Sequence, residues 1–469
     1  MNKTAEDVSR ETFRDSISTV TKEGKRRWVY PKKPSGKFYR ARTIVSVFLL
    51  LFLVAAPFIK VAGRPFILFN VLERKFVVFG IYFGPQDIYF FALAMIAFIV
   101  SIFLFTVVYG RLFCGWICPQ TVFMEMVFRK IEYWLEGDAK EQRKLNQLPM
   151  NPRKFRIKAA KHIIFFAISF AIANIFLAYI IGSDNLLKYI THSPALHAGT
   201  FIAVLIFSGV FYFVFSYFRE QACVLVCPYG RLQGVMLDEN SIVIHYDYKR
   251  GEPRGKLRRG EERTAGDCID CNQCVEVCPT GIDIRNGTQL ECVNCTACID
   301  ACDYVMDRIG KPKGLIRYAS KNEIETGRRP IMTPKAVGYT VVLFLLLFLI
   351  SFLLINRAEL DVNILRTPGL LSQDQPGNKI SNLYDIKIVN KTSKEINPKI
   401  EVENKNAEIK IIGENLKVKP QSIAEAKFFI ILPKSDIKTI KTPLTVNVYA
   451  NDKVIKKINT SFLARPEKK

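Results

Sequence analysis

The sequence predicts a multi-domain membrane protein: an α-helical bundle of five transmembrane spans, an inserted cysteine-rich domain and a C-terminal all-β sandwich. Three observations lead to this fold class. Five apolar stretches are long enough to cross a bilayer, for which about 20 residues suffice. All twelve cysteines lie in clusters between residues 114 and 302. The last part of the chain alternates apolar and polar side chains in short segments, which is typical of strands with one buried face.

The apolar stretches are expected to form spans at residues 44–59, 87–109, 162–182, 200–217 and 336–355. The first is the shortest and contains Pro57, which would interrupt a helix. Polar and basic residues fill the 43 positions before it. We therefore expect a signal anchor here rather than the apolar region of a cleavable signal peptide.

The formal net charge of +24 follows the pattern of the spans. Lys and Arg number twelve before the first span, eleven between the second and third, and eighteen between the fourth and fifth, but only four and one in the two remaining loops. Cytoplasmic loops of membrane proteins carry such an excess of basic residues. We expect the N-terminus, the second loop and the large fourth loop to be cytoplasmic, and the C-terminal segment to lie outside. Because topology explains most of the basicity, nucleic-acid binding is disfavoured.

Eight of the cysteines form two runs, "CIDCNQCVEVCP" from Cys268 and "CVNCTACIDACD" from Cys292. Each run is a C-x₂-C-x₂-C-x₃-C pattern, the bacterial ferredoxin signature for a [4Fe–4S] cluster. Three closely spaced cysteines bind one cluster, and in two-cluster ferredoxins its fourth ligand comes from the other run. The sequence therefore predicts two clusters. The expected ligand sets are Cys268, Cys271, Cys274 and Cys302 for one, and Cys292, Cys295, Cys298 and Cys278 for the other.

Zinc is the alternative for these eight cysteines. Zinc sites usually combine one C-x₂-C pair with a distant second pair, which a tandem octet fits poorly. Haem is disfavoured, because the chain has four histidines and no pair of them inside a span. The predicted topology also places every cysteine on the reducing cytoplasmic side, where thiols serve metals or catalysis more often than disulfides. We interpret the octet as a conduit for single electrons.

Two further pairs of cysteines, each followed by proline, come directly after the second and fourth spans. They are Cys114 and Cys118 in "FCGWICPQ", and Cys223 and Cys227 in "ACVLVCPY". Residues four apart share a face of a helix, so the two thiols of each pair are expected to point the same way. The proline is expected to bend or end the helix. If the two spans are neighbours, four thiols converge beneath the membrane beside the cluster domain.

Thiolates are soft ligands that select Cu(I), zinc or iron–sulfur, so the spacing alone leaves the metal open. Arg111 and Arg219 precede the two pairs and are expected to lower the thiol pKa values. Met124 and Met126 offer thioether ligands, although packing in the core is the commoner role of methionine. We predict a metal or redox role for the four cysteines, with packing at a helix end as the alternative.

Two other segments complete the organisation. Residues 125–144 place apolar side chains at helical spacing and predict a helix along the inner membrane surface. The alternating stretches after the fifth span predict a sandwich of immunoglobulin-like size that binds a partner outside the membrane. The expected domains are a basic cytoplasmic segment 1–43, spans one to four with the first cysteine pair at 44–220, the second pair and the two-cluster ferredoxin domain at 221–335, the fifth span at 336–355 and the sandwich at 356–469.

The stretches "GRLFCGWICPQTVF" and "FREQACVLVCPYGRLQ", together with the octet and its flank "DYVMDRIGKPKGLIRY", resemble the FixG/RdxA/CcoG family of membrane polyferredoxins. Members of this family are accessory proteins of cbb3-type cytochrome c oxidase. The resemblance covers nearly the whole chain and is most specific in the central motifs. It implies a multi-pass protein of the bacterial inner membrane, with the clusters cytoplasmic and the C-terminal domain periplasmic.

The resemblance further implies that the protein reduces Cu(II) to Cu(I) for insertion into the oxidase, with electrons from the two clusters. Cys114, Cys118, Cys223 and Cys227 would then be the catalytic residues that bind copper. The expected partners are cytochrome oxidase subunits or copper-delivery proteins and a cytoplasmic electron donor, and a homo-oligomer stays open.

Two alternative functions remain from the sequence. One is an electron conduit of the quinol dehydrogenase type, a related class with CxxxCP motifs and two clusters. The other is a non-enzymatic assembly scaffold, in which the β domain binds oxidase subunits and the clusters only sense redox state.

Overall fold

The structure is a computed structural model that describes residues 18–465, except for positions 22, 62, 72–73, 257–265, 329–332, 359, 370–371, 393–394, 405, 414–416, 421, 438 and 451–452. The chain divides into two compact units. We call the first, Met1–Glu73 with Tyr89–Phe348, the membrane–cluster unit. The second, Arg74–Ile88 with Leu349–Lys469, is the C-terminal unit.

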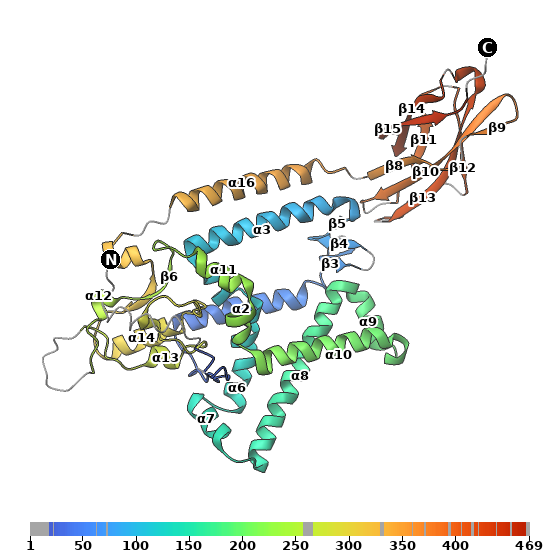
Figure 1. The fold of residues 1–469 in the computed structure, drawn as a ribbon. Coiled ribbons are helices and arrows are strands. Elements are labelled where there is room, and N and C mark those ends of the chain that lie inside the picture. The colour runs from blue at the N-terminus through green and yellow to red at the C-terminus, as the bar shows by residue number, and fades with distance from the viewer. Residues whose placement is uncertain are drawn as a thin grey trace. The chain divides into compact units, whose positions relative to one another are not determined.

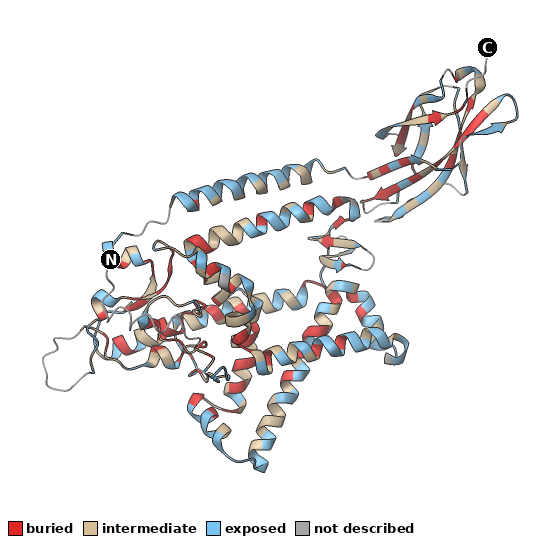
Figure 2. Cartoon of the chain, viewed as in Figure 1, coloured by how far each residue is buried: buried red, intermediate tan, exposed pale blue. Residues whose placement is uncertain are grey.

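Among the described residues, five helices are long and apolar enough to cross a membrane (Figure 1). They are α2 Lys37–Ala55, α3 Ile88–Tyr109, α8 Pro152–Ile181, α10 Ala198–Phe213 with its flanking turns η4 Pro194–His197 and η5 Val214–Phe218, and α16 Pro334–Ile355. Much of their surface is exposed (Figure 2), and Phe48, Ile206 and Phe344 are each more than 60% exposed. Lipid is the solvent that favours such apolar surfaces. The chain is a multi-pass membrane protein.

The helices begin and end where local chemistry dictates. α2 ends at Ala55, two residues before Pro57, which has no backbone N–H to continue the hydrogen bonding of the helix. α8 begins ten residues before the expected start of the third span. Asn151 caps it by accepting a hydrogen bond from the backbone N–H of Lys154 (2.7 Å), and Pro152 occupies the first helical position, where no N–H is needed.

The connection between α3 and α8 consists of short helices. They are α4 Leu112–Trp116, α5 Pro119–Thr121, the π-helical segment η3 Val122–Phe128, α6 Arg129–Leu135 and α7 Ala139–Gln147. The prediction of one surface helix over residues 125–144 is therefore wrong. The helix breaks at Gly137, and Arg129 and Glu132 are buried because they form ion pairs inside the unit.

The cysteine-rich part folds around a small antiparallel sheet of β6 Val243–Tyr246 and β7 Ile316–Ala319. Two helices carry cysteines, α13 Gln273–Glu276 and α14 Ala297–Arg308. Asp300 of α14 also caps the first span, since its carboxylate accepts hydrogen bonds from the backbone N–H groups of Phe38 (3.2 Å) and Tyr39 (2.8 Å). The cluster-bearing helix is thus fastened to the beginning of α2. The remaining elements of this unit are β1 Lys60–Val61, β2 Arg64–Pro65, β3 Ile67–Asn70, α9 Ser183–Thr191, η6 Ala222–Val226, α11 Pro228–Met236, α12 Tyr248–Gly251, η7 Ile284–Asn286 and α15 Lys321–Thr326.

The C-terminal unit is the predicted all-β sandwich. One sheet has the order β12-β13-β10-β8, with β9 also paired to β10, and the other has the order β11-β14-β15. The strands are β8 Leu360–Arg366, β9 Gln373–Gln375, β10 Lys379–Asn390, β11 Lys399–Val402, β12 Glu408–Ile412, β13 Ile423–Pro433, β14 Lys441–Ala450 and β15 Lys453–Leu463. Alternate residues of both sheets fill one core, for example Tyr384 and Ile386 of β10, Phe428 of β13 and Val446 of β14. The hairpin of β4 Lys75–Val78 and β5 Ile81–Phe83 belongs to the same unit.

Asp87 joins the parts of the C-terminal unit. Its side chain is 1% exposed, and it accepts hydrogen bonds from Arg357 (2.5 Å) and Lys391 (2.7 Å). Burial alone would raise the pKa of Asp87, but the hydrogen bonds from Lys391 and Arg357 outweigh it and lower the pKa below the ordinary value. The carboxylate therefore stabilises the folded unit above the pKa of an unfolded aspartate, and this stabilisation is lost as the pH falls through the lower folded pKa.

We expect Asp87→Asn to destabilise the C-terminal unit by roughly 3 kcal/mol, because two buried cations lose their counter-charge. Hydrogen exchange of the β8–β15 amides in the full-length protein measures this free energy. Asp361→Asn is the matched control, since Asp361 pairs with Lys456 at a largely exposed site and should change the free energy by less than about 1 kcal/mol. Equal protection in the two variants would contradict the prediction.

Candidate functional site

The two cysteine runs adopt the same backbone geometry. In each run the residues on both sides of the second cysteine are left-handed: Asp270 and Asn272 around Cys271, and Asn294 and Thr296 around Cys295. The second of these residues begins a short helix that carries the third cysteine of the run. Left-handed residues among right-handed ones turn successive N–H groups towards one concave side, an arrangement found at many iron–sulfur sites. The backbone therefore fits two similar clusters.

The expected exchange of the fourth ligand agrees with the side-chain arrangement. Burial raises the pKa of Cys302 to about 12, and the charges of Cys274, Cys271 and Cys268 add to the shift. Burial also raises the pKa of Cys298, and the charges of Cys295, Cys292 and Cys278 add most to this shift. The fourth cysteine of each run thus lies within reach of thiols of the other run, and the exchange of the fourth ligand stays a prediction.

The second set also lines one common cavity. Cys278, Cys292, Cys295 and Cys298 surround it together with Cys274 of the first set and the apolar side chains of Ile244, Ile282, Ile284 and Val293. A polynuclear cluster would displace the protons of these thiols, because metals bind thiolates. The donor set and its apolar surroundings fit a [4Fe–4S] cluster at this place. In the first set, Cys271 is exposed, so that site lies nearer the surface.

Both CxxxCP motifs interrupt the helix between their two cysteines. Cys114 lies in α4, which ends at Trp116, and Cys118 is the residue that precedes α5 with an extended ψ of 125°. Cys223 lies in the π-helical segment η6, and Cys227 precedes α11 in the same way. The expectation that each pair shares one helix face is therefore wrong. The expected helix end is confirmed, and each proline begins the next helix, where its missing N–H costs nothing.

The four thiols of the two motifs are neighbours. Burial raises the pKa of Cys223 to about 12, and the charges of Cys118, Cys114 and Cys227 add to this shift. Cys114 Sγ donates a hydrogen bond to Oε1 of Gln233 (3.2 Å), a buried side chain of α11. Within the described residues, no three histidine, cysteine or carboxylate side chains lie close enough to hold a single ion. The two motifs therefore lie within reach of each other's charge, and the closer convergence of all four thiols stays a prediction.

The expected lowering of the thiol pKa values is wrong for Cys114. Burial raises its pKa to about 12, and the opposing effect of Arg111 is smaller. Arg111 instead donates hydrogen bonds to the carbonyls of Leu290 and Cys292, at the start of the second cysteine run. Arg219, which is expected from the sequence to act on the second cysteine pair, forms an ion pair with Glu132.

The first CxxxCP motif packs directly against the loop of the second cluster. A Cβ atom built on Gly115 would lie 2.5 Å from the carbonyl oxygen of Asn294 and 2.6 Å from that of Val293. Arg42 of α2, which is 4% exposed, donates from Nε to the carbonyl of Gly115 and from Nη1 to the carbonyl of Cys295, both at 3.0 Å. A glycine and one buried guanidinium thus hold the motif against the cluster loop.

A second contact runs through two aromatic side chains. Trp116 Nε1 donates to Tyr318 Oη (3.2 Å), and Tyr318 Oη donates to the carbonyl of Asn294 (3.2 Å). Burial raises the pKa of Tyr318, so its hydroxyl stays protonated and able to donate. The thiol site and the second cluster loop therefore share several short polar contacts.

Buried ion pairs support the π-helical segments. Arg129 is 1% exposed and donates to Glu125 (2.7 Å), while its other end lies 3.6 Å from Glu220. Arg219 bonds to Glu132 and has a φ of +53°, a left-handed conformation that is strained for a side-chain-bearing residue. The carbonyl oxygen of Arg219 accepts a hydrogen bond from Nε2 of Gln120 at 3.2 Å, and Gln120 directly follows Pro119 of the first motif.

Met124 and Met126 lie in the interior, at 3% and 7% exposed. Met124 belongs to an apolar cluster with Phe123, Phe128 and Phe165. Core packing, the commoner role of methionine, accounts for its position.

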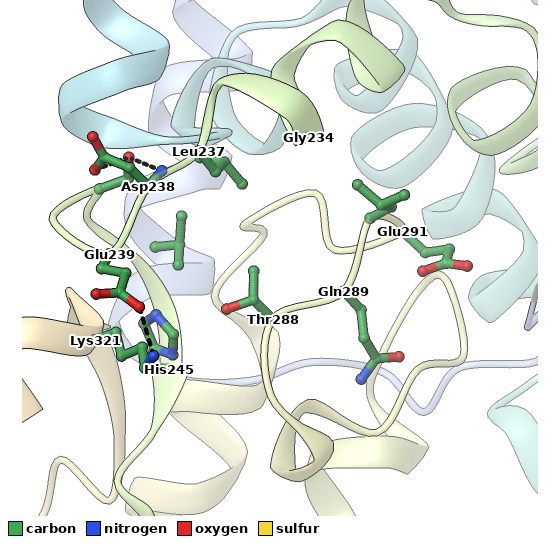
Figure 3. A pocket seen from close by; sticks show the side chains of 12 residues that line it. Gly234, Leu237, Asp238, Glu239, His245, Thr288, Gln289, Glu291 and Lys321 are labelled. Atoms are coloured by element: carbon green, nitrogen blue, oxygen red, sulfur yellow. Dashed lines mark hydrogen bonds and ion pairs between the residues drawn. The ribbon is translucent and has the colours of Figure 1, made fainter. Parts of the chain in front are cut away.

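A pocket of about 510 Å³ adjoins the cluster loop (Figure 3). Its lining includes Leu290 and Glu291, which directly precede Cys292, and Gly234, which follows Gln233. The lining holds three carboxylates, of Asp238, Glu239 and Glu291, and one lysine, Lys321, which pairs with Glu239 (2.7 Å). Burial lowers the pKa of His245 to about 4, so that imidazole is neutral at pH 7. The pocket therefore carries excess negative charge, which attracts cations.

Comparison with known proteins identifies the parts of the chain. Residues 218–321 match a family model described as "4Fe-4S dicluster domain", residues 91–138 one described as "4Fe-4S binding domain", and residues 350–465 one described as "IG-like fold at C-terminal of FixG". The nitrogen fixation protein FixG of Rhizobium meliloti is 31% identical, with 87% of each chain covered. The chain belongs to the FixG family. Protein RdxB of Cereibacter sphaeroides is 35% identical over 78% of this chain and 80% of that one, and protein RdxA of the same organism is 34% identical over 66% and 65%.

These findings confirm the resemblance and the fold class. This FixG-family chain is an iron–sulfur electron-transfer protein with transmembrane helices and an immunoglobulin-like C-terminal domain. Sequence reasoning missed Arg42, Gln233 and Tyr318, whose contacts with the motifs and the cluster loop span 24 to 253 residues of chain. A buried arginine just inside the first span is the signal that could have pointed to Arg42, because such a charge needs a partner.

We expect Gly115→Ala to destabilise the membrane–cluster unit by about 1–3 kcal/mol and to weaken retention of the second cluster, because the new methyl group meets backbone rather than a movable side chain. Thermal unfolding and iron analysis measure both effects. Gly209→Ala in α10 is the matched control, since its Cβ would meet no atom within 4 Å and alanine favours a helix. Unchanged stability and iron content in the Gly115 variant would contradict the close contact.

Proposed function

We propose that the protein reduces Cu(II) to Cu(I) at the four CxxxCP thiols, with electrons from its iron–sulfur clusters, in the assembly of a cbb3-type cytochrome c oxidase. The proposed cluster ligands are the two sets of four cysteines with the exchanged fourth ligand, as described above. The basic loops support a bacterial cytoplasmic membrane protein with these sites on the cytoplasmic side and the β-sandwich outside.

One observation carries this proposal: the first CxxxCP motif packs directly on the loop of the second cluster set, and the thiols of the two motifs lie near enough for their charges to act on Cys223. Copper enters as the substrate, and each Cu(II) gains one electron and leaves as Cu(I). Bound at the octet, [4Fe–4S] clusters would supply single electrons, which is the stoichiometry this reduction needs. Thiolates bind Cu(I) in preference to harder cations, so they favour the reduced product.

The surrounding residues have positioning roles. Arg42 fixes the distance between the motif and the cluster loop, because it binds a carbonyl on each side. Gln233 accepts from the Cys114 thiol and donates to Thr106 of α3, so it holds that sulfur next to the second span (3.2 and 3.3 Å). The acidic pocket beside the cluster loop would raise the local concentration of the cupric substrate.

The test uses full-length, anaerobically reduced protein and a chelator that absorbs light only with Cu(I). Wild-type protein is expected to convert added Cu(II), and the variant with Cys114, Cys118, Cys223 and Cys227 changed to alanine should do so at least about tenfold more slowly. Val226→Ala, an exposed change beside Cys227, is the control and should match the wild type. Undiminished reduction in the four-cysteine variant, with its octet iron intact, would overturn the proposal.

A second candidate for the four thiols is an iron–sulfur cluster of their own. The match that favours it is the "4Fe-4S binding domain" model over residues 91–138, a stretch whose cysteines are Cys114 and Cys118. In this case the motifs would relay electrons, and copper would not bind there.

Iron analysis separates the two candidates. Copper handling predicts about eight irons per chain, and the same number in the four-cysteine variant. A further [4Fe–4S] cluster predicts about twelve irons, falling to about eight in the variant, with a matching loss of acid-labile sulfide. We expect about eight irons per chain in both the wild type and the four-cysteine variant.

A further inference from the structure

A second cavity, of about 660 Å³, lies at one membrane-proximal end of the membrane–cluster unit. Its volume is in the range of small-molecule sites. Its lining comes from the beginning of α8, the end of the fourth span, the α6–α7 region and the N-terminal segment: Trp28, Tyr30, Glu132, Glu136, Gln142, Asn146, Lys158, Lys161, His162, Tyr212, Phe213, Ser216, Tyr217 and Arg219. Neither the motifs nor the cysteine runs contribute to it.

Aromatic rings form one part of the wall. Trp28 and Tyr217 meet edge to face with their centroids 6.0 Å apart, and Phe213 stacks on Tyr217 at 5.5 Å. The guanidinium of Arg26 lies 3.7 Å above the ring of Trp28 and holds it in place. Rigid aromatic walls of this kind favour a flat, apolar ring as ligand.

A histidine–tyrosine pair supplies adaptable hydrogen bonding. His162 Nδ1 lies 2.8 Å from Tyr212 Oη, and either atom can donate, depending on the tautomer of the ring. When His162 Nδ1 accepts a hydrogen bond from Tyr212, the Nε2 atom of the imidazole carries the proton. When Nδ1 donates to Tyr212, the Nε2 atom carries a lone pair. The same pair can therefore donate to a carbonyl oxygen or accept from a hydroxyl group.

The charges of the lining nearly cancel. Glu136 pairs with Lys158 (2.8 Å) and Lys161 (2.9 Å), and Glu132 pairs with Arg219. An anion would have to compete with these carboxylates for the same cations. The lining therefore favours a neutral ligand with polar atoms over a phosphate or a carboxylate.

One buried donor in the lining still lacks a hydrogen bond. Arg219 is 5% exposed, and its Nε has no hydrogen-bond partner among the described residues, although it lies 4.0 Å from Glu220. A buried N–H without an acceptor costs about 1–3 kcal/mol, which a ligand oxygen would recover.

The cavity is placed where a membrane-soluble molecule can reach it. His162 is in the third turn of the long helix α8, and Tyr212 to Tyr217 end the fourth span. His162 is exposed on the outer surface of α8, and apolar neighbours such as Ile163 are exposed beside it. The lining thus includes residues at the ends of two spans, where a molecule dissolved in lipid can approach.

We propose that this cavity binds the ring of a membrane quinol or quinone. Such a ligand is neutral and planar, dissolves in lipid, and carries hydroxyl groups in one redox state and carbonyls in the other. Those are the features that the aromatic wall, the His162–Tyr212 pair and the Arg219 donor fit. The claim of binding stands by itself. Only the idea that a bound quinol is the electron donor rests on the proposed function, with two electrons and two protons released per quinol to iron–sulfur acceptors and to bases such as Glu136.

Binding is tested on the full-length protein in detergent with decylubiquinone, whose fully substituted ring does not add to thiols. Trp28 is one of three tryptophans and lines the cavity, so bound quinone should quench part of the fluorescence in a saturable way. Trp28→Phe should remove this component. His162→Ala and Tyr212→Phe should each weaken binding about tenfold, because either change removes the adaptable pair. Tyr212→Phe keeps the ring and serves if the alanine variant does not fold.

His197→Ala is the matched control, since His197 contacts Tyr189 at the other end of the same two spans. Its affinity should equal that of the wild type. Unchanged binding in both pocket variants would overturn the proposal, and so would displacement of the probe by phosphatidylglycerol with no preference for quinone, which would indicate a lipid headgroup site. Saturable binding in the four-cysteine variant supports this site even if copper reduction fails, so the two proposals can fail separately.

Discussion

The approach of Gly115 to the carbonyls of Val293 and Asn294 is the contact on which the candidate site depends. It brings a thiol pair from the end of a transmembrane helix to the backbone of a ferredoxin-type loop without any side chain between them. Arg42 joins the two segments at this contact, because it donates to the carbonyl of Gly115 on one side and to that of Cys295 on the other. These two hydrogen bonds offset the free-energy cost of burying the Arg42 guanidinium, as a buried charge requires. The spacing of the two redox sites is therefore set by one missing Cβ atom and one guanidinium.

The helix breaks within the two CxxxCP motifs are related to the same close contact with the cluster loop. A continuous helix would carry Cys114 and Cys118 past the cluster loop, but the chain ends α4 at Trp116 and restarts at Pro119. The second motif does the same at Cys227, so both second cysteines lie at the start of a helix with extended backbone. Three π-helical segments, η3, η5 and η6, and the strained φ of Arg219 accompany these turns, and irregular backbone of this kind concentrates at functional sites.

Periodic features of the molecule could be predicted from the sequence, because they are local. Apolar runs of about 20 residues specify the spans, alternation specifies the strands of the sandwich, and the cysteine spacing indicates the iron–sulfur domain. Predictions that depended on tertiary contacts were less accurate. Arg111 was expected to lower the pKa of Cys114, but the thiol is buried and desolvation dominates. Arg129 and Glu132 were expected on a membrane-surface helix, but partners from distant segments bury them. No spacing in the sequence marks such partners.

Arg219 links the two regions of the membrane–cluster unit that carry chemistry. Its side chain lines the aromatic cavity and pairs with Glu132, while its carbonyl holds Gln120 at the first motif, and Cys223 follows four residues later. The left-handed backbone costs on the order of 1–3 kcal/mol, and the surrounding ion pairs must outweigh it for the conformation to persist. A ligand that bonds to the Nε of Arg219 would act on the residue whose carbonyl holds Gln120 beside the first motif. The cavity and the thiol site are therefore coupled through one residue, even though they share no lining side chain.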